Sequence, residues 1–555
     1  MSMFCYQCEQ TSQGTGCTTM GICGKSPDTA ALQDLIVHVV KAISQYAHRA
    51  RLLGVRNANV DYKSLEALFM TLTNVNFDVE EHIEYIIALG DTLAQARKLY
   101  EDECIKQGTA VQILKGPAEW MPNYNRLATM AYAHSLSINE RMKRDGTTLV
   151  GLQELVTYGV KGLAAYAHHA QLLGYSDDAV FAFVHEVLDY LSQPTALQSE
   201  QDLLSYALQA GAVNLRVMEL LDKAHTETFG HPEPTLVRTT PVAGKCILVS
   251  GHDLKSLYEL LKQTEGRGVN VYTHGELLPA LAYPEMKKFS HLIGNYGGAW
   301  QKQNQEFAQF PGAILVTTNC LKPPTPEYEE RLFTMDTVGF EGITKIFNYD
   351  YTKVIDAALK STGFAESEEL KAITIGFGRN SVLSVADKVI DAVKAGKIRH
   401  FFLVGGCDGA EFTRNYFTEL AEKIPNDCVI LTLGCGKYRF NMEDFGDIDG
   451  IPRLLDLGQC NDAYSAVEIA KALAEAFGCG INDLPLSLFI SWFEQKAVAV
   501  LLSLLYLGVK NIRLGPALPA FISPEVLDKL VQAYAIAPVT TPTKDLAGIL
   551  SPVKA

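Results

Sequence analysis

Four cysteines stand close together near the start of this chain of 555 residues, in the spacing C-x2-C-x8-C-x5-C. They are Cys5, Cys8, Cys17 and Cys23. Thiolates gathered in this way bind structural zinc or an iron–sulfur cluster, and the spacing matches neither common ferredoxin pattern, so both remain open. A thioredoxin-type redox pair fits less well, because no strand precedes Cys5. The compact spacing favours one closed four-thiolate site, which becomes an electron relay if the chain holds a second redox metal centre.

Seven further candidate ligands follow predicted strands in the second part of the chain. They are His252, Glu276, Cys320, Cys407, Cys435, Cys460 and Glu494. In an open α/β sheet, the carboxyl ends of the strands meet at one edge, where binding sites form. Taken singly, a cysteine after a strand is more often a small buried apolar residue, and a glutamate there usually begins a helix. Seven such residues at equivalent places predict a shared metal centre.

The ligand types indicate which metal chemistry to expect. Soft thiolates favour iron–sulfur chemistry, whereas carboxylates and an imidazole favour a harder iron with oxygen ligands, so the mixed set predicts a mixed cluster. Neighbouring glycines, such as Gly406 and Gly434, allow the backbone to approach a cluster closely. The remaining cysteines lie in or at the ends of predicted strands and helices, and we interpret them as structural: Cys104, Cys246, Cys428 and Cys479.

The chain has no nucleotide-binding fingerprint. No G-x-G-x-x-G opens a helix after a strand, since GFGRNS from Gly376 departs from the pattern at its last position. No phosphate-binding G-x-x-x-x-G-K-[ST] is present. We therefore expect the chain to bind neither nicotinamide nor flavin and to receive its electrons from a separate donor.

Composition excludes several classes of partner. The chain is 48% hydrophobic and 20% charged, and its formal net charge of -15 argues against nucleic acid and anionic membrane surfaces. The longest apolar run, Ala497 to Val509, is too short to cross a membrane, and the opening MSMFCYQC does not resemble a secretory signal. We expect a soluble, cytoplasmic protein. In that reducing compartment, twelve cysteines are better explained by metal or redox chemistry than by disulfides.

The elements that must position these residues fall into two kinds. From about Leu32 to Thr228, apolar residues recur at helical spacing. Within this region VKAISQYAHRARLLG, from Val40, and VKGLAAYAHHAQLLG, from Val160, share nine of fifteen positions at an offset of 120. Further helical stretches follow each copy, so the pattern predicts a duplicated bundle of about three helices per copy. We assign the equivalent His48 and His168 to duplicated packing rather than to a ligand role.

After a linker rich in proline and glycine (GHPEPT), short β-branched runs alternate with helical stretches, which is typical of parallel sheets. Among the predicted strands are KCILVSG, VNVYTHG and AILVTTNC, and then AITIGFG, HFFLVGG, CVILTLG, RLLDLG, LSLFISWF and NIRLG. We predict an all-α N-terminal region of duplicated three-helix bundles, followed by two α/β domains with mostly parallel, Rossmann-like sheets. The boundaries fall at residues 1–228, 229–362 and 363–555.

Extended phrases around these residues resemble the hybrid-cluster proteins, a family of hydroxylamine reductases. The resemblance covers the whole chain and is carried by CYQCEQT, SGHDL, YTHGELLPA, TTNC, GGCDGAE, LGCGKYRF, DLGQCND and SWFEQKAV. It implies that the N-terminal quartet holds a [4Fe-4S] cluster, because the short spacing resembles that subgroup rather than the one with wider spacing and a [2Fe-2S] cluster. The seven strand-end residues would hold the family's hybrid [4Fe-2O-2S] cluster, at the interface of the domains.

The resemblance also implies roles for single residues and a reaction. Cys407 matches the cysteine that carries a persulfide, and Lys496 matches a lysine beside the cluster. The implied reaction is the two-electron reduction of hydroxylamine to ammonia and water. Glu494 and Lys496 are then candidates to deliver protons or hold the substrate; alternatively, Glu494 only ligates iron and Lys496 only balances charge.

Three other functions also agree with parts of the sequence. The same cluster would suit the reduction of nitric oxide to nitrous oxide. A carbon monoxide dehydrogenase-like enzyme is less favoured, because the chain has a single N-terminal quartet and two glutamates among its ligands. A zinc-stapled interaction protein would explain the quartet but not the seven strand-end residues. For the enzymatic alternatives we expect a small substrate and an external electron donor protein, either ferredoxin-like or an NADH-dependent reductase.

Overall fold

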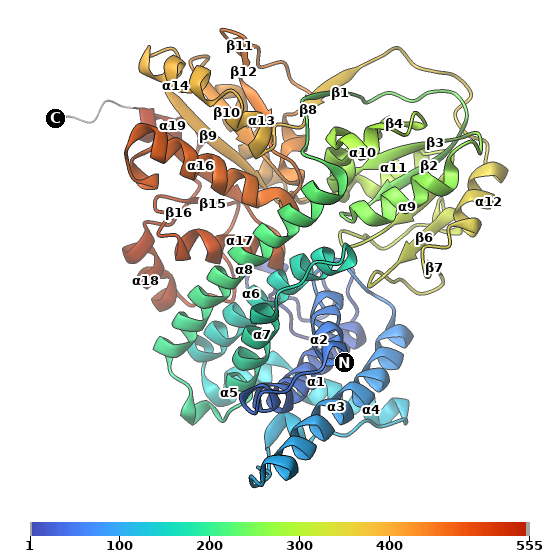
Figure 1. Cartoon of the computed structure of the whole chain (residues 1–555), viewed down its shortest axis with the longest axis vertical. Helices are drawn as coiled ribbons and strands as arrows, with labels where there is room; N and C mark the ends of the chain where they lie inside the picture. Colours follow the sequence, from blue (N-terminus) through green and yellow to red (C-terminus); the bar gives the residue numbers. More distant parts are fainter. Residues whose placement is uncertain (1–2, 551–555) are drawn as a thin grey trace.

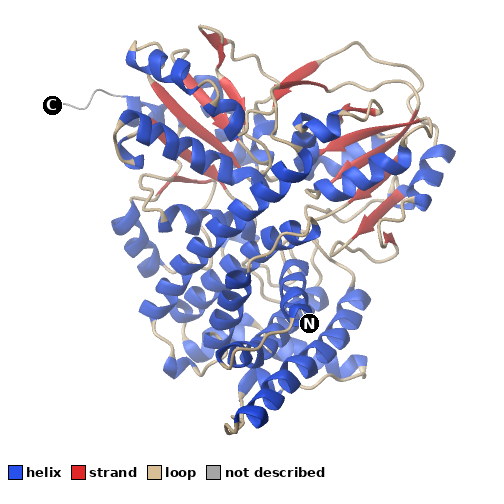
Figure 2. Ribbon diagram, in the orientation of Figure 1, coloured by secondary structure: helices blue, strands red, loops and turns tan. Residues whose placement is uncertain are grey.

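The computed structural model describes residues 3–550. Its first part is helical, and its second part holds two large sheets flanked by helices (Figures 1 and 2). The first copy of the repeat forms α1 (Pro27–Leu52), α2 (Ala58–Met70) and α3 (Val79–Gln107). The second copy forms α6 (Thr147–Leu172), α7 (Asp178–Tyr190) and α8 (Glu200–Phe229). The duplicated three-helix arrangement is confirmed. Two helices that the repeat does not predict, α4 (Arg126–Ser135) and α5 (Ile138–Asp145), connect the copies.

Polar caps and apolar faces explain where these helices begin and how they pack. Ser26 accepts a hydrogen bond from the backbone N–H of Thr29 at the start of α1, and Asp78 caps α3 in the same way. Gly108 ends α3 in the left-handed conformation, with φ at 68°. Helix α1 packs on α3 and α7, and α6 packs on α2 and α8, so both copies share one hydrophobic core.

The first large sheet is parallel throughout, with the order β4-β3-β2-β5-β6-β7. Its strands are β2 (Lys245–Ser250), β3 (Val269–His274), β4 (Leu292–Asn295), β5 (Ala313–Val316), β6 (Leu332–Met335) and β7 (Thr344–Ile346). Helices α9 (Leu254–Thr264), α10 (Pro284–Lys287), α11 (Gln303–Gln309) and α12 (Thr352–Lys360) connect or follow them. The strand order reverses between β2 and β5, and such a reversal opens a crevice at the carboxyl ends of the strands.

The second large sheet is also parallel, with the order β13-β10-β9-β14-β15-β16. Its strands are β9 (His400–Gly406), β10 (Cys428–Thr432), β13 (Leu454–Asp456), β14 (Leu486–Ser491), β15 (Arg513–Gly515) and β16 (Ala537–Pro538). Its helices include α14 (Ala386–Lys394), α15 (Asn415–Lys423), α16 (Ala463–Phe477), α17 (Gln495–Tyr506), α18 (Pro524–Tyr534) and α19 (Pro542–Leu550). Here the strand order reverses between β9 and β14. The predicted class of fold is confirmed.

One predicted strand pairs differently from its neighbours in the sequence. The stretch AITIGFG forms β8 (Ala372–Ile375), which pairs antiparallel with β1 (Thr235–Arg238) in a separate two-stranded sheet. Both partners are short and lie between the two large sheets (Figure 1). Because β1 and β8 come from either side of the boundary predicted at residues 362 and 363, this sheet joins the two predicted α/β domains. The domain boundaries themselves stay predictions.

Two global features concern the cysteines and the helices. All twelve cysteines lie within the described residues, and each is a free thiol there. Among residues 3–550, no helix combines the length and the apolar character that a membrane crossing requires.

Candidate metal centre

One internal cavity is lined by all seven strand-end residues that the sequence singles out. His252, Glu276 and Cys320 follow β2, β3 and β5, which are neighbours in the first sheet. The other four follow β9, β10, β13 and β14 of the second sheet. The carboxyl edges of the two sheets therefore face one another across the cavity. Two aromatic side chains, Trp300 and Phe493, complete its wall.

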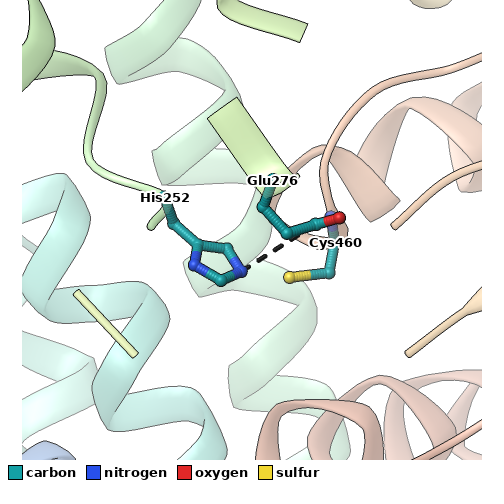
Figure 3. A group of neighbouring side chains, drawn as sticks. All are labelled: His252, Glu276 and Cys460. Atoms are coloured by element: carbon teal, nitrogen blue, oxygen red, sulfur yellow. Dashed lines mark hydrogen bonds and ion pairs between the residues drawn. The ribbon is translucent and has the colours of Figure 1, made fainter. Parts of the chain in front are cut away.

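Three of these residues form the tightest group (Figure 3). The potential ligand atoms of His252, Glu276 and Cys460 all lie within 4.8 Å of one another. The Nε2 atom of His252 lies 3.8 Å from Oε2 of Glu276, which accepts a hydrogen bond of 2.8 Å from the backbone N–H of Cys460. The other oxygen of Glu276, Oε1, is buried and has no hydrogen-bond partner among the described residues. An orphaned buried carboxylate oxygen beside an imidazole and a thiol is the arrangement expected of metal ligands.

The protonation of these groups depends on their burial. Burial, with Lys496 and His169 nearby, holds the pKa of His252 well below its usual range, so its imidazole is neutral and can ligate a metal. Burial raises the pKa of Cys407 to about 12 and the pKa values of Cys320 and Cys435 well above the usual range. Buried thiolates beside carboxylates need a compensating cation, and a metal cluster provides one. The donor set therefore fits an iron–sulfur centre with oxygen ligands.

The backbone around the cavity is arranged for close approach. Gly406 has φ at 110°, and a Cβ atom there would lie 2.1 Å from the carbonyl oxygen of Ser491 on the neighbouring strand. The backbone N–H of Asp408 donates to Sγ of Cys435 across 3.1 Å. Cys320 adopts a left-handed φ of 76°, which is costly for a residue with a side chain and is found mostly at functional sites.

Glu494 and Lys496 lie where β14 passes into α17. Oε2 of Glu494 caps the helix by accepting a hydrogen bond of 2.9 Å from the backbone N–H of Lys496. The Nζ atom of Lys496 donates to Oδ1 of Asn319 across 3.2 Å and lies 5.8 Å from the centre of the Tyr166 ring. Burial alone lowers the pKa of Lys496, but Cys460 and Glu494 together raise it above its ordinary value. The lysine thus places a positive charge beside the seven candidate ligands.

The structure also brings the N-terminal cysteines together. The backbones of Cys5 and Cys17 pair through hydrogen bonds of 3.1 Å and 2.8 Å. Burial raises the pKa of Cys8 well above its usual range, and the nearby Cys23, Cys5 and Cys17 raise it further. The backbone N–H of Ser12 donates to Sγ of Cys17 across 3.4 Å. The quartet therefore forms one compact group of thiols on loops, as expected for a four-thiolate site.

The two candidate centres are linked by direct packing. Cys8 belongs to the same buried cluster as Cys407 and Cys435, together with Trp300 and Phe493. The backbone N–H of Glu9 donates to the carbonyl oxygen of Phe493 across 3.0 Å. One hydrogen bond thus connects the residue after Cys8 with the residue before Glu494.

Sequence reasoning misses several residues of this region because they are not metal-ligand types or lie far away in the chain. Trp300, Phe493 and Asn319 carry no spacing signal. His169 lies on α6, with its ring centre 6.3 Å from that of His252, and both of its ring nitrogens lack a hydrogen-bond partner among the described residues. Its only sequence signal is the change from YAHRA in the first repeat to YAHHA in the second.

Curated relatives match the chain over nearly its full length. Hydroxylamine reductase from Burkholderia ambifaria (strain MC40-6) is 54% identical over 553 residues, covering 99% of each chain. The enzyme of the same name from Rhodospirillum rubrum is 53% identical over 550 residues, again covering 99% of each. That from Geobacter metallireducens is 50% identical over 554 residues, covering 99% of this chain and all of the relative.

Solved structures with a similar fold include two carbon monoxide dehydrogenases. The nickel-free enzyme from Thermococcus sp. AM4 superposes with a TM-score of 0.55 at 16% identity, covering 98% of this chain and 90% of that one. Carbon monoxide dehydrogenase IV from Carboxydothermus hydrogenoformans superposes with a TM-score of 0.53 at 15% identity, covering 96% of this chain and 88% of that one. These likenesses concern the fold. The model of the Prismane/CO dehydrogenase family matches residues 3–547. Together with the full-length relatives, this match confirms the resemblance to the hybrid-cluster proteins. The chain therefore belongs to the Prismane/CO dehydrogenase family, and membership implies bound iron–sulfur clusters.

Proposed function

We propose that this chain reduces hydroxylamine to ammonia and water, taking up two electrons and two protons for each N–O bond that it breaks. The observation that carries the proposal is the convergence of seven donors, five buried and two half-buried, on one cavity, in a chain whose relatives at 50–54% identity bear the name of that activity. The proposed site of action is the cytoplasm.

We further propose which groups the two sites hold. The N-terminal quartet would hold a [4Fe-4S] cluster, and the seven strand-end residues would hold a hybrid [4Fe-2O-2S] cluster, with Cys407 as the persulfide. When bound, the hybrid cluster supplies an iron that acts as a Lewis acid and an acceptor and donor of electrons. The unpartnered Oε1 of Glu276 and the neutral imidazole of His252 support this assignment.

The chain's own residues supply protons and exclude water. The ammonium of Lys496 is a proton donor beside the cavity, and its hydrogen bond to Asn319 fixes its direction. The indole of Trp300 and the ring of Phe493, with centres 4.6 Å apart, cover the cavity and keep bulk water away. A small substrate with its own hydrogen-bonding groups would be held between this apolar wall and the lysine.

Electrons would enter the protein at the N-terminal quartet and pass to the substrate in the cavity lined by the seven strand-end residues. The hydrogen bond from Glu9 to Phe493 gives a path of covalent bonds and one hydrogen bond between Cys8 and Glu494. The buried ion pair between Glu9 and Arg414, at 2.6 Å, holds this segment in place. The donor would be a separate protein, either ferredoxin-like or an NADH-dependent reductase.

Nitric oxide is a second candidate substrate, because the apolar wall of the cavity suits a small neutral molecule as well as it suits hydroxylamine. Reduction of nitric oxide to nitrous oxide would use the same ligands and the same electron path. Relative kcat/KM for the two substrates decides between them.

The test begins with anaerobic purification, followed by measurement of iron, nickel and zinc per chain, electron paramagnetic resonance, and assays on both nitrogen compounds. We expect about eight irons per chain and two distinguishable paramagnetic centres. Zinc without iron would contradict the proposal, and nickel would favour carbon monoxide chemistry. Cys435→Ser should remove one centre, whereas the matched Cys428→Ser, at a buried cysteine outside the cavity, should keep both.

A further inference from the structure

A second cavity, of about 1030 Å³, lies among the helical bundles and reaches the N-terminal quartet at Cys5. Its walls come from α1, α5 and α6, from the segment around residues 112–117, and from the loop that carries the quartet. Twelve charged side chains line this cavity. Six of them lie close enough to shift one another's pKa values, four of them buried and two, Asp34 and Arg141, half-buried: Lys25, Asp34, Lys41, Arg141, Glu154 and Lys161.

Some of these charges are satisfied within the protein. Arg141 forms an ion pair of 2.6 Å with Glu154, and Lys25 donates to Gln33 across 2.5 Å. Lys161 donates a single hydrogen bond of 3.3 Å, to the amide oxygen of Gln7. All three interactions involve α6 or the chain immediately around the quartet.

Asp34 and Lys41 are different. Both lie on α1 and line the cavity, yet the side chain of neither forms a hydrogen bond or an ion pair within the described part of the chain. Lys41 is only 9% exposed. Placing an acid and an amine at the wall of a roomy polar cavity costs free energy unless water hydrates them, and water also carries protons.

The charges around the cavity are unbalanced in a way that fits a metal cluster. Seven cationic side chains face five carboxylates over the whole lining, and four face two within the group of six, so either count leaves two positive charges in excess in the cavity that reaches Cys5. Four thiolates around a cubane iron–sulfur core carry a net negative charge, and reduction adds one more. The cavity therefore compensates the oxidised cluster but has no further fixed charge for the added electron.

We propose that reduction of the N-terminal cluster is coupled to the uptake of one proton by Asp34, whose charge is influenced by Glu154 and Lys161 at the wall of the same cavity. The electron enters the cluster, and the proton from solvent converts the Asp34 carboxylate to a carboxylic acid, so the net charge of the region is unchanged. The inference rests on the proposed function, in which the quartet holds a redox cluster. The uptake of one proton for each electron at this cluster has the same ratio as the proposed reaction, which consumes two protons and two electrons.

The acid–base properties of the surrounding groups agree with this assignment. Burial and then the charge of Glu154 raise the pKa of Asp34 to about 7, against the opposing effect of Lys161. Burial, with Arg141 nearby, lowers the pKa of Lys41 to about 8. Burial, with Lys25 nearby, lowers the pKa of Lys161 to about 8. Because a new negative charge raises the pKa of any group near it, reduction favours the protonated form of Asp34.

The other groups that face Asp34 do not compete for the proton near neutral pH. Burial and the neighbouring Lys41 lower the pKa of His38 to about 4, so that ring is neutral, and it bonds to the hydroxyl of Tyr132 at 3.1 Å. Burial raises the pKa values of Tyr6 and Tyr158, which stay protonated. Arg141 stays charged, because Glu154 raises its pKa above the ordinary value despite burial.

The test is a potentiometric titration of the holoenzyme, followed by the paramagnetic signal of the N-terminal cluster, at several values between about pH 6 and 9. The midpoint potential of the wild-type cluster should fall as pH rises, with a limiting slope of about 59 mV for each tenfold change in proton concentration. Asp34→Asn should remove the slope, because the amide takes up no proton. Asp91→Asn, at an exposed carboxylate on α3, is the matched control and should keep it.

A second variant and a second readout keep the assignment testable if Asp34→Asn folds poorly. Lys41→Met removes a positive charge, so the sloping region should move to higher pH. The infrared difference spectrum on reduction should gain a carboxylic-acid band in the wild type. A potential that is independent of pH in the wild type, or a slope that Asp34→Asn leaves unchanged, overturns the assignment. A chain with no iron at the quartet refutes the proposed function instead.

Discussion

The side chain of Lys496 could position the substrate, deliver a proton to it, or do both. Its ammonium is buried, bonded to Asn319 and close to Tyr166, while its backbone N–H bonds to Glu494. Only the side-chain interactions are lost when the residue is shortened. The helix cap made by Glu494 remains, since it uses the backbone.

Lys496→Ala should therefore lower kcat for hydroxylamine by about 10²- to 10⁴-fold, the range expected when a positioned general acid is removed. The paramagnetic signals of both clusters should be retained. Steady-state kinetics and spectroscopy on the same preparation make the comparison. Loss of the hybrid signal would instead assign the lysine a structural role, and unchanged turnover would assign it charge balance alone.

At this scale the sequence predicts the candidate ligands well and their surroundings poorly. A ligand at the end of a strand is found from a local pattern, because the strand precedes it directly. Trp300 lines the cavity, and His169 packs beside His252, only because elements far apart in the chain come together. Asn319 stands directly before Cys320 but is not a metal-ligand type, and its bond to Lys496 joins two distant segments. No local pattern records such contacts.

Among the elements, α17 is held in place by close packing against two helices of the second repeat. It begins at the Glu494 cap and packs against both α6 and α8. The approach is so close that a Cβ atom at Gly162 would lie 2.3 Å from the carbonyl oxygen of Gln495, and one at Gly211 would lie 2.2 Å from that of Leu502. The second helical repeat thus supports the N-terminal end of α17, and with it the glutamate that faces the cavity.

Gly162→Ala should destabilise the protein by about 1–3 kcal/mol, because an added methyl group forces α17 away from α6. We expect a lower Tm and reduced occupancy of the hybrid cluster. Gly548→Ala is the matched control. It lies in α19 with no atom within 4 Å of the added Cβ, so the higher helix propensity of alanine should raise stability slightly. Equal Tm values for the two variants would show that α17 tolerates displacement.

Helices and strands with strong local signals are predicted correctly. Which strands pair with one another is not always predicted correctly. The repeat gives both three-helix sets, since apolar periodicity over 26 or more residues in α1 and α6 is unambiguous. Strand β8 has the composition of a central strand but pairs with β1, because pairing depends on which partner the rest of the fold brings near. Strands β6 and β7, of four and three residues, are not among the predicted strands, although the equally short β13 and β15 are.

Across the whole molecule, the candidate hybrid site joins parts that otherwise have separate cores. The first sheet packs in two hydrophobic clusters, and the second sheet packs in two others, one of which it shares with the helical bundles. His252, Glu276 and Cys320 come from one sheet, and the remaining four ligands come from the other. A bound cluster would therefore act as a cross-link between the two α/β parts, and its binding free energy would stabilise their association.

Removal of the metal should loosen this association more than it loosens the helical bundles. After anaerobic treatment with a chelator, we expect a lower Tm and faster hydrogen exchange in the loops after β3, β5, β9 and β13. Exchange in the core of α3 should change little, because α3 packs on α1 and α2 and lines neither cavity. Restoring iron and sulfide should reverse both changes. Exchange that rises uniformly along the chain would show that the clusters hold the whole fold together, and unaltered exchange would show that the two sheets associate without them.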